Sequence, residues 1–291
     1  MATFSLASSL FVFNKDNKAD GDPYAALDAI AAAGFSQTEL MAEGAIWEPS
    51  GGPDPKPFRH AIEHSAVTPR TLHTPMSEVN LASSIEEVRS ASVGRIADSL
   101  RFFAELGGQT AIVHPTGRPG AGEAPFAPHN IGVAMENAYR SVADLVEVAR
   151  ETGVQIALEN LPVTGLVCRP LMTMQELRAF VAPFPAELVG LCLDTGHARI
   201  CGLDPALQAR VAAERLCALH LQDVDGERDC HWVPGHGVID WSALGTALAE
   251  IGFDGAWTVE ALSKNTDLTA EEVAAECSTV CGRWESDDMS S

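Results

Sequence analysis

The chain has 291 residues, close to the usual length of one α/β barrel. Acidic residues outnumber basic residues by 40 to 19, which gives a formal net charge of −21. This charge disfavours binding to DNA and to anionic membranes, because both partners are themselves negatively charged. No stretch reaches the roughly 18 apolar residues that a membrane-spanning helix requires.

The seven cysteines are scattered and include no Cys-x-x-Cys pair. An odd number without regular spacing argues against a disulfide framework and is typical of a reducing compartment. The N-terminal segment lacks a basic start and a long apolar run, so we expect a first strand there and not a signal peptide. We therefore expect a cytoplasmic protein.

Short apolar runs alternate with helical patterns along the chain. We expect strands at 6–13, 37–41, 70–75, 110–115, 155–161, 189–195, 217–223 and 256–262. We expect helices at 23–33, 55–67, 84–106, 130–152, 173–182, 204–216, 240–251 and 269–285. Strands that alternate with helices in this way indicate a parallel sheet with helical crossovers.

Eight such repeats favour a closed barrel over an open, doubly wound sheet. The open alternative calls for a Gly-x-Gly-x-x-Gly motif after an early strand, and the sequence has none. We therefore predict an α/β fold, a single (β/α)8 TIM barrel domain over residues 1–291, with a polar tail from about residue 286. The long loop 42–58 is rich in Gly and Pro, and we expect it to overhang the mouth of the barrel.

Six predicted strands finish with an acid or an imidazole instead of an apolar side chain. These residues are His73, His114, Glu159, Asp194, His220 and Glu260. The C-terminal ends of the strands converge at one mouth of a barrel, so these residues should meet there. Three carboxylates and three imidazoles in a semi-buried pocket are costly without compensation. A divalent cation supplies that compensation, and mixed carboxylate and imidazole ligands suit Mn²⁺, Fe²⁺, Co²⁺ or Zn²⁺ better than Ca²⁺.

Several short motifs lie at these strand ends and in the loops that follow them. In chain order they are LHTP, IVHP, ALEN, LDTGHA, LHLQDVDG, PGHGVIDW and IGFDGAWTVE. Together they resemble the xylose isomerase-like barrel superfamily, which includes sugar isomerases and epimerases and the endonuclease IV relatives. The resemblance covers nearly the whole chain and is not specific for a substrate.

The resemblance to the ketose epimerases implies one divalent metal ion held by Glu159, Asp194, His220 and Glu260. Mn²⁺ is the first choice, with Mg²⁺, Co²⁺, Fe²⁺ or Zn²⁺ as alternatives. It also implies that Glu159 and Glu260 are the catalytic residues, which remove and return a proton next to the carbonyl of a sugar or polyol-derived ketone. The metal would stabilise the enediolate as its charge develops.

Further side chains near the mouth are expected to contact the substrate: His73, His114, His197, Asp229 and His231. For Asp229, His231 and His236, ordinary turn chemistry in a Gly-rich loop is the competing explanation. Trp47 and Trp232 would either stack on a sugar ring or pack as ordinary hydrophobic residues. Arg118 would either meet an anionic group of the substrate or stay a solvated loop residue.

One departure from the epimerase pattern leaves alternatives open. Epimerases of free ketohexoses carry an arginine six residues after the strand-7 histidine, where this chain has Gly226. A lyase acting on an inosose-like or shikimate-like ketone is therefore the first alternative. A second is a three-zinc phosphodiesterase of the endonuclease IV type. The nine ligand positions of that branch are matched here by His73, His114, Glu159, Asp194, His197, His220, Asp229, His231 and Glu260.

The remaining alternative is a non-catalytic partner subunit, against which the intact pair Glu159 and Glu260 argues. The net charge weighs against a DNA substrate. We therefore expect a small-molecule sugar or polyol substrate and no nucleic-acid or membrane partner. Relatives of this kind often assemble, so a homo-oligomer is left open.

Overall fold

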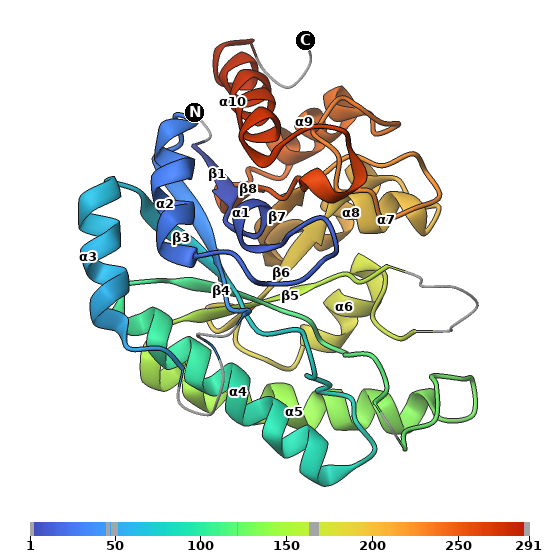
Figure 1. The fold of residues 1–291 in the computed structure, drawn as a ribbon. Helices are drawn as coiled ribbons and strands as arrows, with labels where there is room; N and C mark the ends of the chain where they lie inside the picture. The colour runs from blue at the N-terminus through green and yellow to red at the C-terminus, as the bar shows by residue number, and fades with distance from the viewer. Residues whose placement is uncertain (1–2, 45–46, 48–51, 121, 163–168, 288–291) are drawn as a thin grey trace.

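The computed structural model describes residues 3–44, 47, 52–120, 122–162 and 169–287. Its strands form a closed parallel barrel in the order β1 to β8, with helices packed around it (Figure 1). The strands are β1 (Phe4–Ala7), β2 (Gln37–Met41), β3 (Thr68–His73), β4 (Thr110–Val113), β5 (Gln155–Glu159), β6 (Val189–Asp194), β7 (Leu216–Leu221) and β8 (Ala256–Val259). The predicted (β/α)8 barrel is confirmed.

The eight predicted helices are all present and begin within two residues of their expected starts, and two short helices, α1 and α7, were not predicted. They are α1 (Ser9–Val12), α2 (Pro23–Ala32), α3 (Pro55–Ser65), α4 (Glu86–Glu105), α5 (Ile131–Thr152), α6 (Met174–Val181), α7 (Thr195–Ile200), α8 (Pro205–Ala212), α9 (Trp241–Glu250) and α10 (Ala270–Asp287). Helices α2, α3 and α8 each begin at an Asp-Pro pair, in which the aspartate accepts a hydrogen bond from a first-turn N–H. Proline at this position lacks only an N–H that the helix would leave unpaired. The Asp-Pro pair therefore fixes the residue at which the helix begins.

The strand predicted at 6–13 is wrong beyond its first two residues. β1 ends at Ala7, and Ser9–Val12 form the short helix α1. The chain leaves the sheet at Ser8, whose hydroxyl accepts a hydrogen bond from the backbone N–H of Met41 on β2. An apolar run as short as LFVF does not distinguish a strand from a buried helical turn, because both bury most of its side chains.

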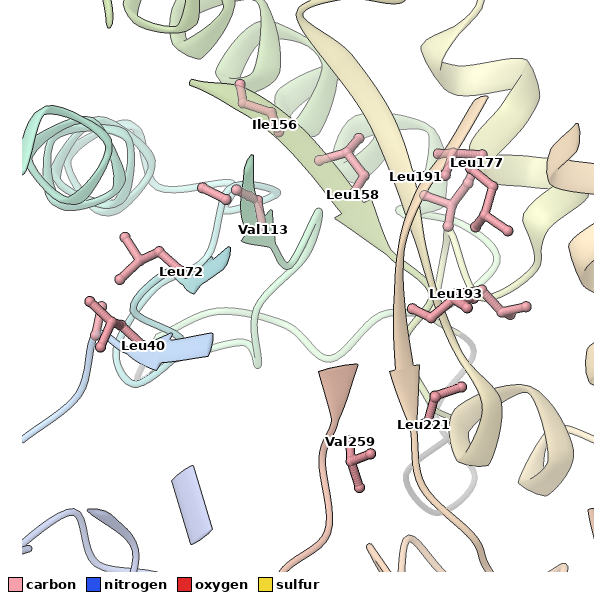
Figure 2. Packing of buried hydrophobic residues seen from close by; sticks show 14 of the residues in the cluster. Leu40, Leu72, Val113, Ile156, Leu158, Leu177, Leu191, Leu193, Leu221 and Val259 are labelled. Carbon is pink, nitrogen blue, oxygen red and sulfur yellow. The ribbon is translucent and has the colours of Figure 1, made fainter. Parts of the chain in front are cut away.

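Alternate strand residues point to opposite faces of the sheet, and the barrel uses the two faces differently. The outward face packs against the helices in the main core (Figure 2), with side chains that include Leu40, Leu72, Val113, Ile156, Leu158, Leu191, Leu193, Leu221 and Val259. The inward face holds a separate small cluster of Ile112, Ala157, Cys192, Ala218 and Ala256. Apolar side chains therefore fill this layer of the barrel interior. The inward positions between this layer and the C-terminal mouth hold polar side chains.

No helix within the described ranges has both the length and the apolar character needed to cross a membrane. The cysteines in the described part of the chain are all free, and Cys168 lies outside the described residues. This agrees with the expectation drawn from their irregular spacing.

Substitution of Leu158 tests how much the packing of the outward face of β5 contributes to the stability of the protein. Leu158 is fully buried between the barrel and the helices. We expect Leu158→Ala to lower the free energy of unfolding by about 2–5 kcal/mol, because it removes buried methyl groups and leaves a cavity. Urea titration followed by circular dichroism measures this, with the half-exposed Leu207→Ala as a control expected to change stability by less than about 0.5 kcal/mol. Equal effects of the two substitutions would contradict the packing described here.

Candidate metal and substrate site

A cavity of about 460 Å³ opens at the C-terminal ends of the strands. Its volume lies within the range of sites that bind small molecules. Among the predicted site residues, its lining includes His73, His114, Arg118, Glu159, His197, Asp229, His231 and Glu260. Asp194 and His220 are fully buried beside these residues and do not line the cavity. The strand-end residues predicted to converge therefore do converge.

The alternation of each strand explains why these side chains point inward. His114, Glu159, Asp194 and His220 each lie two residues after a member of the small interior cluster. A spacing of two keeps a side chain on the same face of a strand. The strand register then sets neighbours side by side, since Asp194 pairs with His220 across β6 and β7.

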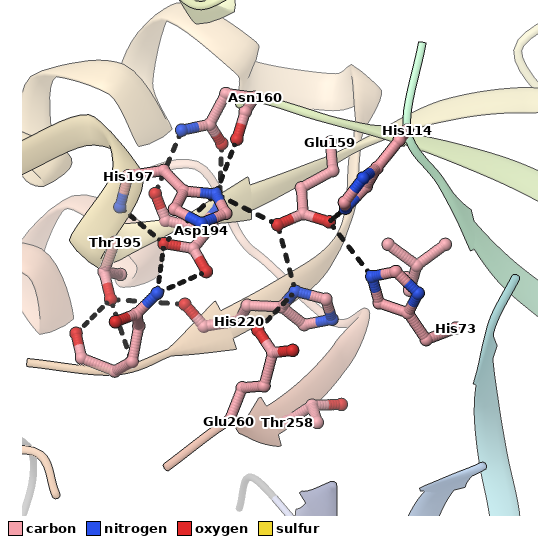
Figure 3. A network of polar contacts seen from close by, with 12 residues as sticks. His73, His114, Glu159, Asn160, Asp194, Thr195, His197, His220, Thr258 and Glu260 are labelled. Carbon is pink, nitrogen blue, oxygen red and sulfur yellow. Dashed lines mark hydrogen bonds and ion pairs between the residues drawn. The ribbon is translucent and has the colours of Figure 1, made fainter. Parts of the chain in front are cut away.

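Glu159 is the centre of the polar network (Figure 3). Its Oε2 lies 3.1 Å from His114 Nε2 and 3.6 Å from His73 Nε2. Its Oε1 lies 3.2 Å from His197 Nδ1 and 3.3 Å from His220 Nδ1. Burial alone would raise the pKa of Glu159, but the charges and hydrogen bonds of the histidines, His220 first, hold that pKa well below its usual range. The buried carboxylate is therefore ionised.

Backbone carbonyls fix the orientation of three of the imidazoles. Nδ1 of His73, His197 and His231 each donates a hydrogen bond of 2.9 Å to a carbonyl oxygen. The acceptors are Thr74, Asn160 and Glu260, in that order. This leaves Nε2 of each ring turned toward a carboxylate of the site. Anchoring one ring nitrogen so that the other is free is the usual arrangement around a metal.

In His220 the anchored ring nitrogen is Nε2 instead of Nδ1. The residue that holds it, Glu39, was not identified from the sequence. His220 Nε2 lies 3.1 and 3.2 Å from the two carboxylate oxygens of Glu39, which also accepts a hydrogen bond of 2.7 Å from Thr71 Oγ1. The free Nδ1 of His220 then faces Glu159 and, at 3.2 Å, Glu260 Oε2. The one signal in the sequence was an acid in the middle of a buried strand, QTELM.

Two amide side chains, also missed, position Asp194. Asn160 pairs with its backbone, accepting from the N–H at 2.8 Å and donating to the carbonyl at 3.0 Å. Gln222 Nε2 donates to both oxygens of the Asp194 carboxylate, at 3.2 and 3.0 Å. The same carboxylate accepts from the N–H of His197 and so begins helix α7. Burial, which outweighs the charge of His197, raises the pKa of Asp194 to about 6.

The loop after β7 brings Asp229 and His231 to the cavity. Asp229 Oδ1 lies 3.3 Å from His231 Nε2 and 3.7 Å from His197 Nε2. His231 has a φ of 50°, in the left-handed region that only glycine adopts freely. Its N–H donates to Gln222 Oε1 at 3.0 Å, which helps to hold this conformation. A non-glycine residue keeps such a backbone conformation only where its surroundings support it, as Gln222 does here.

The rest of that loop is structural. Asp223 accepts hydrogen bonds from the N–H of Gly235 at 2.9 Å and from Trp241 Nε1 at 3.0 Å, and so ties the loop to the start of α9. His236 lies at the surface, where its Nε2 is 3.6 Å from Glu276. Neither Asp223 nor His236 lines the cavity.

The two tryptophans expected at the mouth lie elsewhere. Trp47 is buried in the hydrophobic core, with its ring 4.9 Å from Phe102 and 6.4 Å from Phe58. Trp232 donates from Nε1 to the carbonyl of Asn265 and does not line the cavity. Loop 42–58 thus turns Trp47 toward α3 and α4, because its large apolar ring gains more from the core than from an open mouth. Most of that loop, residues 45–46 and 48–51, lies outside the described residues.

Three groups of side chains within the described residues could hold a cation. They are Glu159, Asp194, His220 and Glu260; His73, His114 and Glu159; and His197, Asp229 and His231. Within each group the ligand atoms all lie within 4.8 Å of one another. Glu159 Oε2 and His220 Nδ1 are buried and form no hydrogen bond among the described residues. The unsatisfied His220 Nδ1 lies 3.3 Å from Glu159 Oε1 and 3.2 Å from Glu260 Oε2. Such spacings fit ligands that share one cation at about 2.1 Å from each.

A family model described as "Xylose isomerase-like TIM barrel" matches residues 27–278. The chain belongs to the xylose isomerase-like TIM barrel family. A solved structure titled as a D-tagatose 3-epimerase-like protein has a TM-score of 0.80 to this family member, at 23% identity over 98% of each chain. At that identity the likeness supports the fold alone.

Relatives of this xylose isomerase-like barrel include proteins with and without a stated activity. The uncharacterized protein MJ1311 of Methanocaldococcus jannaschii is 26% identical over 259 residues, which are 86% of this chain and 83% of that protein. An inosose dehydratase of Lacticaseibacillus casei is 29% identical over 46% of this chain and 49% of its own. A D-psicose 3-epimerase of Enterocloster bolteae is 34% identical over 42% of this chain and 38% of its own. The matched region therefore spans less than half the length of these two enzymes.

Glu39 tests whether a carboxylate behind His220 sets the affinity for a cation. We expect Glu39→Gln to weaken Mn²⁺ binding roughly ten- to a hundredfold, because a neutral amide no longer holds the imidazole in the required orientation and tautomer. Isothermal titration calorimetry on the metal-stripped protein measures the affinity. Thr38→Val is the control, since Thr38 lies on the same strand but its hydroxyl donates to Leu6 and Glu39 carbonyls. Unchanged affinity in Glu39→Gln would exclude this role.

The histidines also predict proton release when a cation binds. Burial alone would lower the pKa of His73 and His231, but Glu159 and Asp229 respectively outweigh it and raise both to about 9. These rings therefore carry a proton at pH 7 and lose it as the pH rises through 9. A nearby dication repels those protons, so Mn²⁺ binding at pH 7 should release protons and should tighten as the pH rises toward 9. Calorimetry in two buffers of different ionisation enthalpy counts the protons; equal heats in both would contradict the prediction.

Proposed function

We propose that the chain is a divalent-metal-dependent isomerase or epimerase of a sugar or polyol-derived ketone. The observation that carries this proposal is the placement of Glu159 and Glu260 around His220, with carboxylate oxygens 3.3 and 3.2 Å from its Nδ1. Both carboxylates also line the cavity, so both have access to a bound small molecule. Two carboxylates facing one substrate are what a proton removal and a proton return require.

The protonation states suit this role. Burial would raise the pKa of Glu260, but the charge of His220 outweighs it and lowers that pKa to about 2. The pKa of Glu159 is also lowered, so both carboxylates are ionised at neutral pH and each begins as a base. One would remove the proton from the carbon beside the carbonyl. The other, after taking up a proton from solvent, would deliver it to the opposite face or to the neighbouring carbon.

Glu159, Asp194, His220 and Glu260 would hold the cation, and Mn²⁺ is our first choice for a mixed set of carboxylates and imidazole. When bound, the cation would stabilise the negative charge of the enediolate formed by proton removal. The imidazoles of His73, His114, His197 and His231 would then bind and orient the oxygens of the substrate. Their anchored rings limit the conformational entropy lost on binding.

A lyase reaction on the same site is a variant of this proposal. It also begins with proton removal beside a carbonyl, and the sequence similarity to an inosose dehydratase supports it. The epimerase pattern has an arginine where this chain has Gly226. This difference argues against a free ketohexose as the substrate of either reaction. Product analysis separates the two reactions, because only the lyase releases water.

A second candidate function is hydrolysis of a phosphodiester at three cations. The observation that favours it is the presence of three potential cation groups, two of which share Glu159, in place of the single group that an isomerase needs. Closely spaced cations can stabilise both the attacking and the leaving oxygen of a phosphoryl transfer. The number of bound ions per chain discriminates between the two candidates.

Solvent exchange tests the proposed function directly. The Mn²⁺-loaded protein is incubated in D₂O with a panel of ketoses and inososes, and proton NMR follows the carbon-bound hydrogens. We expect deuterium to enter beside the carbonyl of at least one compound. Glu159→Gln and Glu260→Gln should each slow this exchange by about a hundredfold or more, because each removes a general base. Metal analysis by mass spectrometry on the same samples separates loss of proton transfer from loss of the cation.

Glu250→Gln is the matched control, since Glu250 pairs with Arg210 at the surface on α9 and should leave exchange unchanged. No exchange with any member of the panel, together with three ions per chain, would replace the proposed function with the hydrolase. Exchange with about one ion per chain would remove the hydrolase.

A further inference from the structure

Two arginines line the same side of the cavity, and only one of them was apparent from the sequence. Arg118 lies in the loop after β4, and Arg169 lies in the loop after β5. β4 and β5 are hydrogen-bonded neighbours in the barrel, so the loops that follow them leave it next to each other. Both guanidinium groups therefore reach one cavity from adjacent loops.

The two arginines lie close to each other and to the centre of the site. Burial, and then the charge of Arg118, lower the pKa of Arg169 to about 10, while the charge of Glu159 acts in the opposite direction. Burial lowers the pKa of His114, and the charges of His73 and Arg169 add to that effect. Each influence requires proximity, and all four residues line the same cavity, so Arg169 lies near Arg118 and near His114 and Glu159. At a pKa of about 10, Arg169 keeps its charge at neutral pH.

Neither arginine has a protein partner among the residues that the structure describes. Several arginines elsewhere on this acidic protein pair with carboxylates, as Arg140 does with Glu86 at 3.3 Å and Arg210 with Glu250 at 2.7 Å. Lys264, the further cation in the cavity lining, donates to Asn17 Oδ1. Two like charges held near each other with no carboxylate in contact are unfavourable, and an anion bound between them would offset their repulsion.

We propose that Arg118 and Arg169 form a subsite for an anionic group, a phosphate or a carboxylate, carried by the small molecule that enters the cavity. A guanidinium group offers donors in a planar fork that matches either anion in two-point contact. The subsite adjoins His114 and Glu159, so an anion on the substrate would place the carbon skeleton over the carboxylates. This deepens the proposed function and rests on it only for the reaction that follows binding.

Equilibrium binding tests the subsite without any need for turnover. The probes for the Mn²⁺-loaded full chain are fructose 6-phosphate, glucuronate and neutral fructose, titrated by calorimetry. We expect one of the two anions to bind at least about tenfold more tightly than fructose, as a charge-assisted hydrogen bond would provide. Arg169→Gln should remove about tenfold of that advantage, and Arg118→Gln should remove part of it.

The control variants separate charge from folding and from direct binding to the cation. Arg169→Lys should retain part of the advantage, because the charge remains while the fork is lost. Arg140→Gln, on α5, should leave it unchanged. A preference for phosphate alone or for carboxylate alone supports the subsite and identifies the group. The subsite is overturned if neither anion binds better than fructose, or if the advantage persists in the Arg118→Gln/Arg169→Gln double variant.

Failure of the anion subsite and failure of the proposed isomerase give different combinations of results. An anion advantage that depends on Arg169, with no proton exchange in any ketone, would leave the subsite standing and remove the isomerase. Proton exchange with a neutral ketone, without tighter binding of either anion, would support the isomerase and remove the subsite.

Discussion

The burial of one carboxylate, that of Glu159, is the constraint on which the rest of the site depends. An ionised carboxylate away from water is tolerated only where opposite charges and hydrogen-bond donors surround it. Four imidazoles do so here, at distances of 3.6, 3.1, 3.2 and 3.3 Å. They come from β3, from the residue after β4, from α7 and from β7. No local segment can assemble this set, so the site exists only when the barrel is closed.

Neutral groups orient this charged centre. Backbone carbonyls hold the rings of His73, His197 and His231, and the side-chain amides of Asn160 and Gln222 hold Asp194. Neutral partners fix geometry without adding charge, so the net charge of the centre is set by its carboxylates and by whatever protons or cations they hold. Glu39 is the exception, since it places a further negative charge behind His220 and would make that ring a stronger ligand for a cation.

Sequence reasoning located the strand ends, because periodicity and the polar residue that ends each strand are both local signals. It therefore identified His73, His114, Glu159, Asp194, His220 and Glu260 as a converging set. It missed Glu39 and Arg169, whose partners lie far away along the chain or are absent from the protein. It also read the apolar run after Ala7 as strand, where the local pattern suits either structure. Contacts between distant segments decide such cases, and one sequence carries no record of them.

The overall charge of −21 and a cavity that favours an anion are compatible, because they act over different distances. At physiological salt the field of surface charges is screened within about 8 Å, so distant acids have little effect on a small ion inside the cavity. There the partly desolvated guanidinium of Arg169 dominates, since electrostatic interactions strengthen where water is excluded. An extended polyanion such as DNA would interact with the net negative charge of the protein over a wide footprint. The same distribution of charge therefore admits a small anion and repels an extended one.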